Sequence, residues 1–390
     1  MSELNPGSDR RPSGLRRLGH EDEFMIDALA GRASAIGFGN SAIAEAILSA
    51  SEDYLGDANQ FDLKGVTEYS ELTDKLSTAL QVEKHLAVET LVLCDSADAA
   101  TETAIAYART WKPDSFRTVA LIGSDHGRTA ACRTASGRPE LHEDFGPMMA
   151  GFAHVPTGDI DALRATVDDQ TACVLISPID LHDAARQLDV GYLNAVREVC
   201  DQHQVALIID ESKLCVGSSG AAFHFAAIAD IQVDGLILSA GLFGGLPGGI
   251  FLGSKQLVAH HEPAAIQLPL QNAVATAIVS EMNELNFPSA VVEPAQQLAV
   301  MLAERVGGFE FIRDLHATGM TIGIETDISA DEIVAAAVKE GLRIETSGET
   351  AIRMQLPLVC SDEDRDSLVE RFGLALEHVE HESVDTAVTP

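Results

Sequence analysis

Short apolar runs alternate with longer amphipathic stretches through the middle of the chain. One stretch, Val190–His203, places Leu193, Val196 and Val199 on one side at helical spacing, and an apolar run follows it directly. Apolar strands that alternate with helices predict a mostly parallel β-sheet, buried on both faces and built with right-handed crossovers. The runs that predict its strands are ETLVLC, TVALIG, TACVLIS, VALIID, DGLILS and GIFLG, at residues 89–94, 118–123, 171–177, 205–210, 234–239 and 249–253.

The pattern changes after about Pro288. A helix followed by a strand occurs twice there, and a final amphipathic helix comes after them. This order predicts a smaller α+β unit. The domain organisation that we expect is an N-terminal arm and segment at 1–40, a large α/β domain at 41–285, a small α+β domain at 286–382 and a disordered tail at 383–390.

The chain is strongly acidic, which restricts its partners. Its 390 residues include 60 acids and 26 bases, for a formal net charge of -34. A surface so negative repels nucleic acid and anionic membranes, and no apolar run is long enough to span a bilayer. The excess of acid fits either a salty cytoplasm, where screening shortens the repulsion, or ordinary solubility.

Cysteine usage indicates the compartment. The six cysteines are scattered and form no CxxC pair, and several lie in apolar runs where a thiol packs as a small hydrophobic group. The N-terminus has no apolar stretch of the kind that a secretory signal needs. These features predict a cytoplasmic protein in a reducing environment, with neither a disulfide framework nor a metal site.

Polar residues follow three of the predicted strands, and a glycine-rich loop follows a fourth. In parallel sheets, ligands bind beyond the carboxyl ends of the strands, so these segments are expected to form the site. Asp210 suits a buried charge partner for a cationic ring nitrogen, and it equally suits a strand-end cap bonded to nearby backbone amides. The segments are residues 94–96, 123–128 and 210–213 and the loop after Ser239.

These strand ends, in this order, resemble those of the class III aminotransferases, above all the acetylornithine and ornithine group. The likeness runs from about Ala42 to Glu377. It implies the pyridoxal-phosphate-dependent fold type I, an α/β fold with a large, mostly parallel sheet domain and a smaller α+β domain, in a homodimer. The segments that carry it are DSADAATETAIAYAR, SDHGRT, VALIIDESK, LILSAGLFGGLPGGIFLGSK and AIRMQLPL.

One position departs from the family where its chemistry would occur. The Schiff-base lysine of the family corresponds to Ala240 in this chain. That lysine forms the internal aldimine and moves the substrate proton, and a methyl group can do neither. Lys213 stands where the family's glutamine reaches the phenolic oxygen of the cofactor, so it is the alternative Schiff-base residue if the protein is active.

The positions that would bind the cofactor have changed as well. The family's Ser-Gly-Ala phosphate cradle reads Ser96, Ala97 and Asp98, and its ring-stacking aromatic residue is Asp125. A carboxylate near a phosphate costs about 4 kcal/mol per charge pair at 4 Å in a surface-like dielectric. Alternatively, Asp98 stabilises the N-terminus of its helix in place of the lost anion. Of the cofactor-binding residues, Asp210 remains as the acid that faces the pyridine ring in the family.

Arg353 matches the family arginine that holds a substrate carboxylate. Bidentate binding of a carboxylate by this arginine needs no cofactor, so it can persist after the loss of the lysine. The alternative is that Arg353 is an ordinary surface charge at the end of a strand. Asp180 and Asp183, two acids that come after Ser177 in the sequence, would crowd such a site with negative charge.

The resemblance and its departures together predict a catalytically degenerate homologue without ordinary transaminase activity, which binds a small carboxylate or a protein partner. No cofactor is expected, and pyridoxal phosphate would bind only non-covalently or through Lys213. Two alternatives stay open: an active enzyme that binds the cofactor unconventionally, and a non-catalytic partner subunit of an active paralogue.

Overall fold

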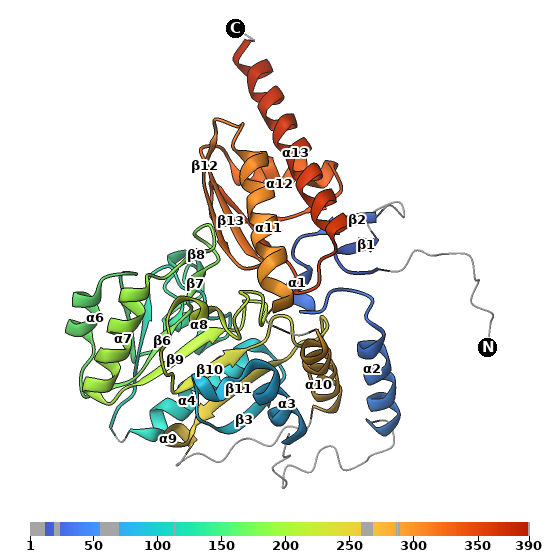
Figure 1. Ribbon diagram of the computed structural model, residues 1–390. Coiled ribbons are helices and arrows are strands. Elements are labelled where there is room, and N and C mark those ends of the chain that lie inside the picture. Colours follow the sequence, from blue (N-terminus) through green and yellow to red (C-terminus); the bar gives the residue numbers. More distant parts are fainter. Residues whose placement is uncertain are drawn as a thin grey trace.

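The computed structural model describes residues 12–18, 24–54, 70–112, 114–258, 268–285, 287 and 289–388. A large α/β domain lies below a smaller α+β domain in Figure 1. The large domain is built on a seven-stranded sheet with the order β3-β11-β10-β9-β6-β4-β5. Its strands are β3 (Val88–Cys94), β4 (Arg117–Leu121), β5 (Phe152–Val155), β6 (Thr171–Ile176), β9 (Ala206–Glu211), β10 (Gly235–Leu238) and β11 (Gly249–Ser254).

The mostly parallel sheet that the apolar runs predict is confirmed, with two differences at its margins. Within the described sheet, β11 is the strand that runs opposite to the other six. The short loop 239–248 joins it to β10, whereas a parallel pair needs a long crossover. The strand β5 was missed because it is an edge strand. Its residues are mostly half-buried, so they form no continuous apolar run.

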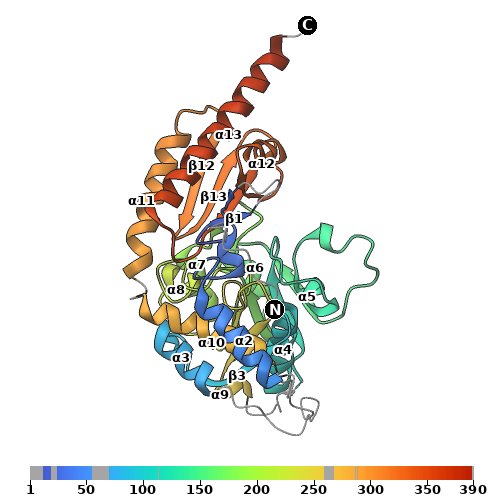
Figure 2. The same cartoon turned by 90° about the vertical axis from the view of Figure 1, so that its right-hand side faces the viewer.

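Helices cover both faces of this sheet because alternate side chains of each strand point to opposite sides. Ile208 packs in the cluster beneath α4, whereas Leu207 and Ile209 pack in the larger cluster with Leu193 and Val196 of α7. Figure 2 shows α2, α3 and α10 together beside the sheet, and α10 contacts both of the other two. The helices are α2 (Ser41–Tyr54), α3 (Ser70–Leu80), α4 (Ala97–Trp111), α5 (Ala130–Ala135), α6 (Ile160–Thr166), α7 (Val190–His203), α8 (His224–Ile228), α9 (Lys255–Val258) and α10 (Pro269–Glu284), with 3-10 turns at Val82–Lys84 and Pro139–Leu141.

The small domain consists of a four-stranded antiparallel sheet with helices packed beside it. A three-stranded sheet, β1-β2-β14, lies against the same helices. A hairpin of β7 (Ile179–Asp180) and β8 (Arg186–Gln187) reaches toward this domain from the large one. The remaining elements are β1 (Arg16–Leu18), β2 (Phe24–Asp27), α1 (Ala30–Ala33), α11 (Ser289–Val306), β12 (Ile312–Thr318), β13 (Thr321–Thr326), α12 (Ala330–Lys339), β14 (Leu342–Arg343), β15 (Glu345–Thr346), β16 (Ala351–Gln355) and α13 (Asp362–Val388).

Both chain ends differ from the expected organisation. The segment at 1–40 is not a separate arm where the structure describes it, because β2 pairs with β14 of the small domain and Leu15 is fully buried. The tail predicted at 383–390 continues α13 as far as Val388, because neither glycine nor proline occurs between Gly373 and Pro390 to end the helix.

All six cysteines are buried and free, and burial raises the pKa of Cys132 and Cys215 to about 12. No helix in the described part of the chain is long and apolar enough to cross a membrane.

The contact between the hairpin and the small domain gives a test of the fold. A β-carbon on Gly323 of β13 would overlap the carbonyl oxygen of Ala184, which lies between β7 and β8. We expect Gly323→Ala to lower the free energy of unfolding in urea by about 1–3 kcal/mol, the usual range for overpacking. Gly308→Ala is the control, because a β-carbon there meets open space. Equal stability of the two variants would show that the hairpin is not held at this distance.

Candidate ligand-binding cleft

The loops that follow the carboxyl ends of β3, β4, β9 and β10 meet at a cleft of about 350 Å³. The strand β16 of the small domain and α1 complete its walls, so both domains contribute side chains. We call it the central cleft. Its lining residues are Arg32, Asp98, Asp125, Gly127, Arg128, Leu181, His182, Ser212, Lys213, Ser239, Ala240, Arg353 and Gln355.

The loop from Asp125 to Thr129 is fixed by aspartate side chains from three parts of the chain. His126 is buried, and its Nδ1 lies 2.7 Å from a carboxylate oxygen of Asp210 on β9. The backbone amides of Arg128 and Thr129 donate to the carboxylate of Asp98, at 2.7 and 2.9 Å. Asp125 accepts from the amide of Gly127 at 3.1 Å. The position of this loop therefore depends on charges that the chain supplies itself.

Asp98 lies in the first turn of α4, where an acid suits the N-terminus of the helix, and its carboxylate is also bonded across the cleft to the amides at the start of α5. Ser96 is the N-cap of α4, and its hydroxyl accepts from the amide of Ala99 at 3.2 Å. The carboxylate of Asp98 thus satisfies backbone donors of a different helix from its own.

Asp210 acts as a strand-end cap and also contacts a ring nitrogen of the chain's own His126. One carboxylate oxygen accepts from the amide of Ser212 at 2.9 Å, as a strand-end cap would, and the other faces His126. Burial raises the pKa of Asp210, but the hydrogen bonds from His126 and Ser212 outweigh it and leave the pKa below its usual range. His126 lies within the segment 123–128 that the sequence predicts for the site, but nothing in the sequence indicates that Asp210 is its partner.

Lys213 is held in an ion pair. Its ammonium contacts Asp125, whose other carboxylate oxygen lies 3.2 Å from Nε2 of His182. Burial raises the pKa of Asp125, but the contacts with His182 and Lys213 outweigh it and hold the pKa far below its usual range. An amine paired in this way is an ammonium ion, which is not a nucleophile.

Ala240 lies at the end of β10 and is 8% exposed. Its amide donates to the carbonyl of Ser212 at 2.9 Å, and its carbonyl accepts from Val216 at 3.2 Å. The glycines that follow it have structural reasons to be glycine: Gly241 has a φ of 87°, and a β-carbon on Gly249 would overlap the carbonyl of Ser96. The loop therefore needs no ligand to explain its composition.

Arg353 projects from β16, and other groups of the chain already accept hydrogen bonds from both of its terminal nitrogens. One terminal nitrogen donates to the carbonyl of Leu181, and the other lies 2.9 Å from Glu345, which also binds Arg32 at 2.6 Å. Burial raises the pKa of Glu345, but the two arginines outweigh it and lower the pKa. Nε of Arg353 is buried without a partner among the described residues. No sequence motif pointed to Glu345, because its role arises from strand pairing.

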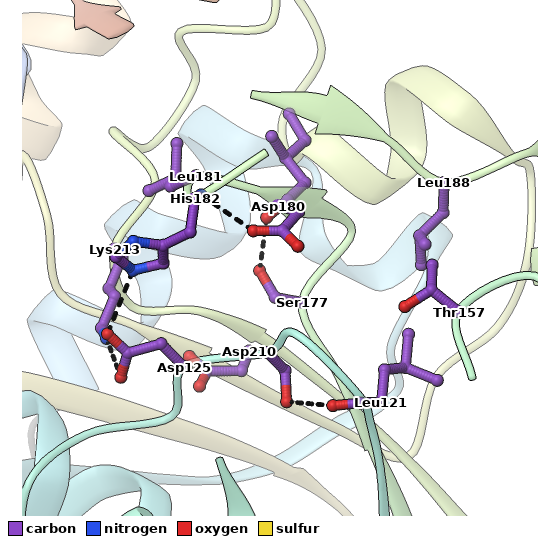
Figure 3. A pocket seen from close by; sticks show the side chains of 12 residues that line it. Leu121, Asp125, Thr157, Ser177, Asp180, Leu181, His182, Leu188, Asp210 and Lys213 are labelled. Carbon is purple, nitrogen blue, oxygen red and sulfur yellow. Dashed lines mark hydrogen bonds and ion pairs between the residues drawn. The ribbon is translucent and has the colours of Figure 1, made fainter. Parts of the chain in front are cut away.

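A second, smaller pocket lies behind the Asp125–Lys213 pair, and Figure 3 shows it from close by. We call it the inner pocket. Asp210 and Asp180 line this pocket rather than the central cleft, while Asp183, which the sequence analysis expected to crowd the site of Arg353, lines neither. The lining residues are Leu121, Ser124, Asp125, Thr157, Ser177, Ile179, Asp180, Leu181, His182, Leu188, Asp210 and Lys213.

These residues do not fit pyridoxal phosphate. The cleft offers Ala240 at the end of β10 and a paired Lys213, so it provides no free amine for an aldehyde. Asp98 and Asp125 place two carboxylates where a phosphate and an electron-poor ring would need cations or apolar surface. Among the described residues, no group of three or more His, Cys, Asp or Glu side chains is arranged to hold a metal ion.

Comparison with known proteins gives one consistent answer. The model of the family described as aminotransferase class-III matches residues 10–376. The acetylornithine aminotransferase of Caldanaerobacter subterraneus subsp. tengcongensis is 26% identical, over 92% of this chain and 91% of its own length. An ornithine aminotransferase 2 of Staphylococcus aureus is 31% identical, over 72% of each chain.

Solved structures agree on the fold. The ornithine aminotransferase of Toxoplasma gondii superposes with a TM-score of 0.83 at 20% identity, over 95% of this chain and 90% of its own. The N-acetylornithine aminotransferase of Stenotrophomonas maltophilia gives 0.75 at 21% identity, over 95% and 96%. The expected fold, with a large α/β domain and a smaller α+β domain, is confirmed.

The ion pair of Asp125 gives a test with a defined pH dependence. Because folding lowers the pKa of this carboxyl group, it stabilises the fold above about pH 4 and loses this effect as the pH falls toward the lower folded value. We expect Asp125→Asn to reduce the free energy of unfolding at pH 7 by about 1–3 kcal/mol, as when a buried charged hydrogen bond is broken. The difference from the unmodified protein should shrink below pH 4.

Asp169→Asn is the matched control for that experiment, since Asp169 is an exposed acid. It removes the same charge without removing the contacts with Lys213 and His182. A loss of stability equal to that of Asp125→Asn would mean that only the net charge matters.

Proposed function

The chain belongs to the class-III aminotransferase family, and we propose that it is a catalytically degenerate member of that family without transaminase activity. The observation that carries the proposal is the site at the end of β10, where Ala240 presents a methyl group to the cleft. The family depends on pyridoxal phosphate, whose aldehyde needs an amine partner.

The alternative Schiff-base residue, Lys213, is not available for this role. Among the described residues that line the cleft it is the one lysine, and its ammonium contacts the carboxylate of Asp125. Freeing it would leave a partly buried carboxylate with only His182 and the amide of Gly127 as partners, which is costly. This supports a degenerate protein over an active enzyme that uses Lys213. Class-III aminotransferases are typically dimers, and we expect this chain to pair with itself.

We expect the protein to purify colourless and to transfer no amino group from acetylornithine, ornithine or 4-aminobutyrate to 2-oxoglutarate when pyridoxal phosphate is added. Ala240→Lys alone should restore no activity, because Asp98 and Asp125 keep their positions in the cleft. Turnover above a no-enzyme control that disappears in Asp210→Asn would contradict the proposal. So would a borohydride-trapped adduct on the peptide that contains Lys213.

A second candidate function, the binding of a small carboxylate, is favoured by the charge of the cleft. In a chain with a net charge of -34, the described lining has four cations, Arg32, Arg128, Lys213 and Arg353, against two carboxylates. The guanidinium of Arg128 has no partner among the described residues, and Nε of Arg353 is buried without one. These donors suit an anion that needs no cofactor.

A thermal-shift screen of amino acids and 2-oxo acids tests this second candidate. We expect a carboxylate to raise the melting temperature of the unmodified protein and to have no effect on Arg353→Ala. Arg164→Ala is the control, because Arg164 is an exposed arginine on α6 that pairs only with Asp161 in the described structure. If every carboxylate stabilises the three proteins equally, or none does, Arg353 has a structural role only.

A further inference from the structure

The inner pocket has a chemical character opposite to that of the central cleft. The two share only a wall, formed by Asp125, Leu181, His182 and Lys213. The inner pocket measures about 30 Å³, on a scale where one buried water needs about 10–15 Å³, so it has room for roughly two water-sized groups.

The pocket lining presents hydrogen-bond acceptors. The hydroxyls of Ser177, Thr157 and Ser124 each donate their hydrogen to a backbone carbonyl, at 3.0, 3.0 and 2.7 Å, so toward a ligand these groups can act only as acceptors. Ser124 already accepts from the amide of Gly137 at 3.3 Å. One oxygen of Asp180 accepts from the amide of His182 at 2.8 Å, and the other has no partner among the described residues. Figure 3 shows Asp180, Ser177 and Asp210 along one side of the pocket, opposite Thr157 and Leu188.

The groups that could donate are already engaged. Lys213 and His182 both contact Asp125. Asp210 faces Nδ1 of His126 and accepts from the amide of Ser212, and although burial raises its pKa, these hydrogen bonds leave the pKa below the usual range.

The remaining wall is apolar. Leu121, Ile179 and Leu188 line it and offer no ligand to a metal ion. The described residues include no cluster of three or more His, Cys, Asp or Glu side chains arranged for a metal. A pocket with acceptors and carboxylates on one side and aliphatic carbon on the other suits an organic cation with N–H groups.

We propose that the inner pocket binds the head of a small primary ammonium ion, with its N–H groups directed to Asp180 and Ser177 and its alkyl carbon against Leu121 and Leu188. This site is separate from the central cleft, and it does not depend on the proposed loss of transaminase activity. Methylammonium, which has two heavy atoms, matches the available volume.

A surface pocket of about 320 Å³ adjoins the inner pocket, and Thr157, Asp180 and Leu188 line both. Asp183 lines this surface pocket, which Asp125 and Lys213 do not line. The strongly negative surface of the chain concentrates small cations near it.

Isothermal titration with methylammonium chloride tests the proposal, in the absence of pyridoxal phosphate and with ionic strength held constant by sodium chloride. We expect saturable binding at one site per chain. Asp180→Asn should weaken it by about tenfold or more, as loss of a hydrogen bond to a charged group does. Asp183→Asn is the matched control, because it removes the same charge outside the inner pocket, and it should bind as the unmodified protein does.

Two further arms separate this site from general cation binding. Tetramethylammonium has no N–H group and should give no saturable heat. Ser177→Leu should fill the pocket and abolish methylammonium binding in a protein whose circular dichroism is unchanged. The proposal is overturned if methylammonium does not saturate, if tetramethylammonium binds as well, or if Asp180→Asn or Ser177→Leu leaves the affinity unchanged.

Discussion

The arrangement of the cleft depends on the need to satisfy three carboxylates at the carboxyl edge of the sheet. Asp98, Asp125 and Asp210 come from α4, from the loop after β4 and from β9, and each contacts the loop that runs from Asp125 to Thr129. A buried charge without partners is costly, so the chain supplies backbone amides, a histidine and a lysine as counterparts. The loop is thereby held by groups internal to the protein.

The same constraint explains why the two pockets differ. Lys213 and His182 neutralise Asp125 and form the wall between the pockets, so that neither amine nor imidazole is free on either side. On one side of this wall, arginines outnumber acids and favour anions. On the other side, Asp180, Asp210 and hydroxyl groups that already donate their hydrogen to backbone carbonyls favour a ligand that donates hydrogen bonds. A family fold that holds one cofactor can in this way offer two small sites of opposite polarity.

Glu345 shows how the small domain takes part in this charge balance. It binds Arg353 and Arg32 together, so an arginine that would grip a ligand carboxylate is partly occupied by a carboxylate of the chain. A ligand in the central cleft would therefore compete with Glu345 or use the donors that remain, such as Arg128 and Nε of Arg353. The triad joins β15 and β16 of the small domain to Arg32 of α1.

The sequence by itself determined the sheet and its central helices, because apolar runs and helical spacing are local properties that survive changes in the site. The motifs at the strand ends indicated the family and located Ala240, Asp98, Asp125, Asp210 and Lys213. The sequence could not determine the partners of the aspartates, since His126 lies 84 residues from Asp210 and His182 lies 57 residues from Asp125, and each pair meets only in three dimensions. The antiparallel β11, the pairing of β2 with β14 and the division into two pockets were likewise decided by the tertiary structure, because each depends on which segments pack side by side rather than on any one segment's composition.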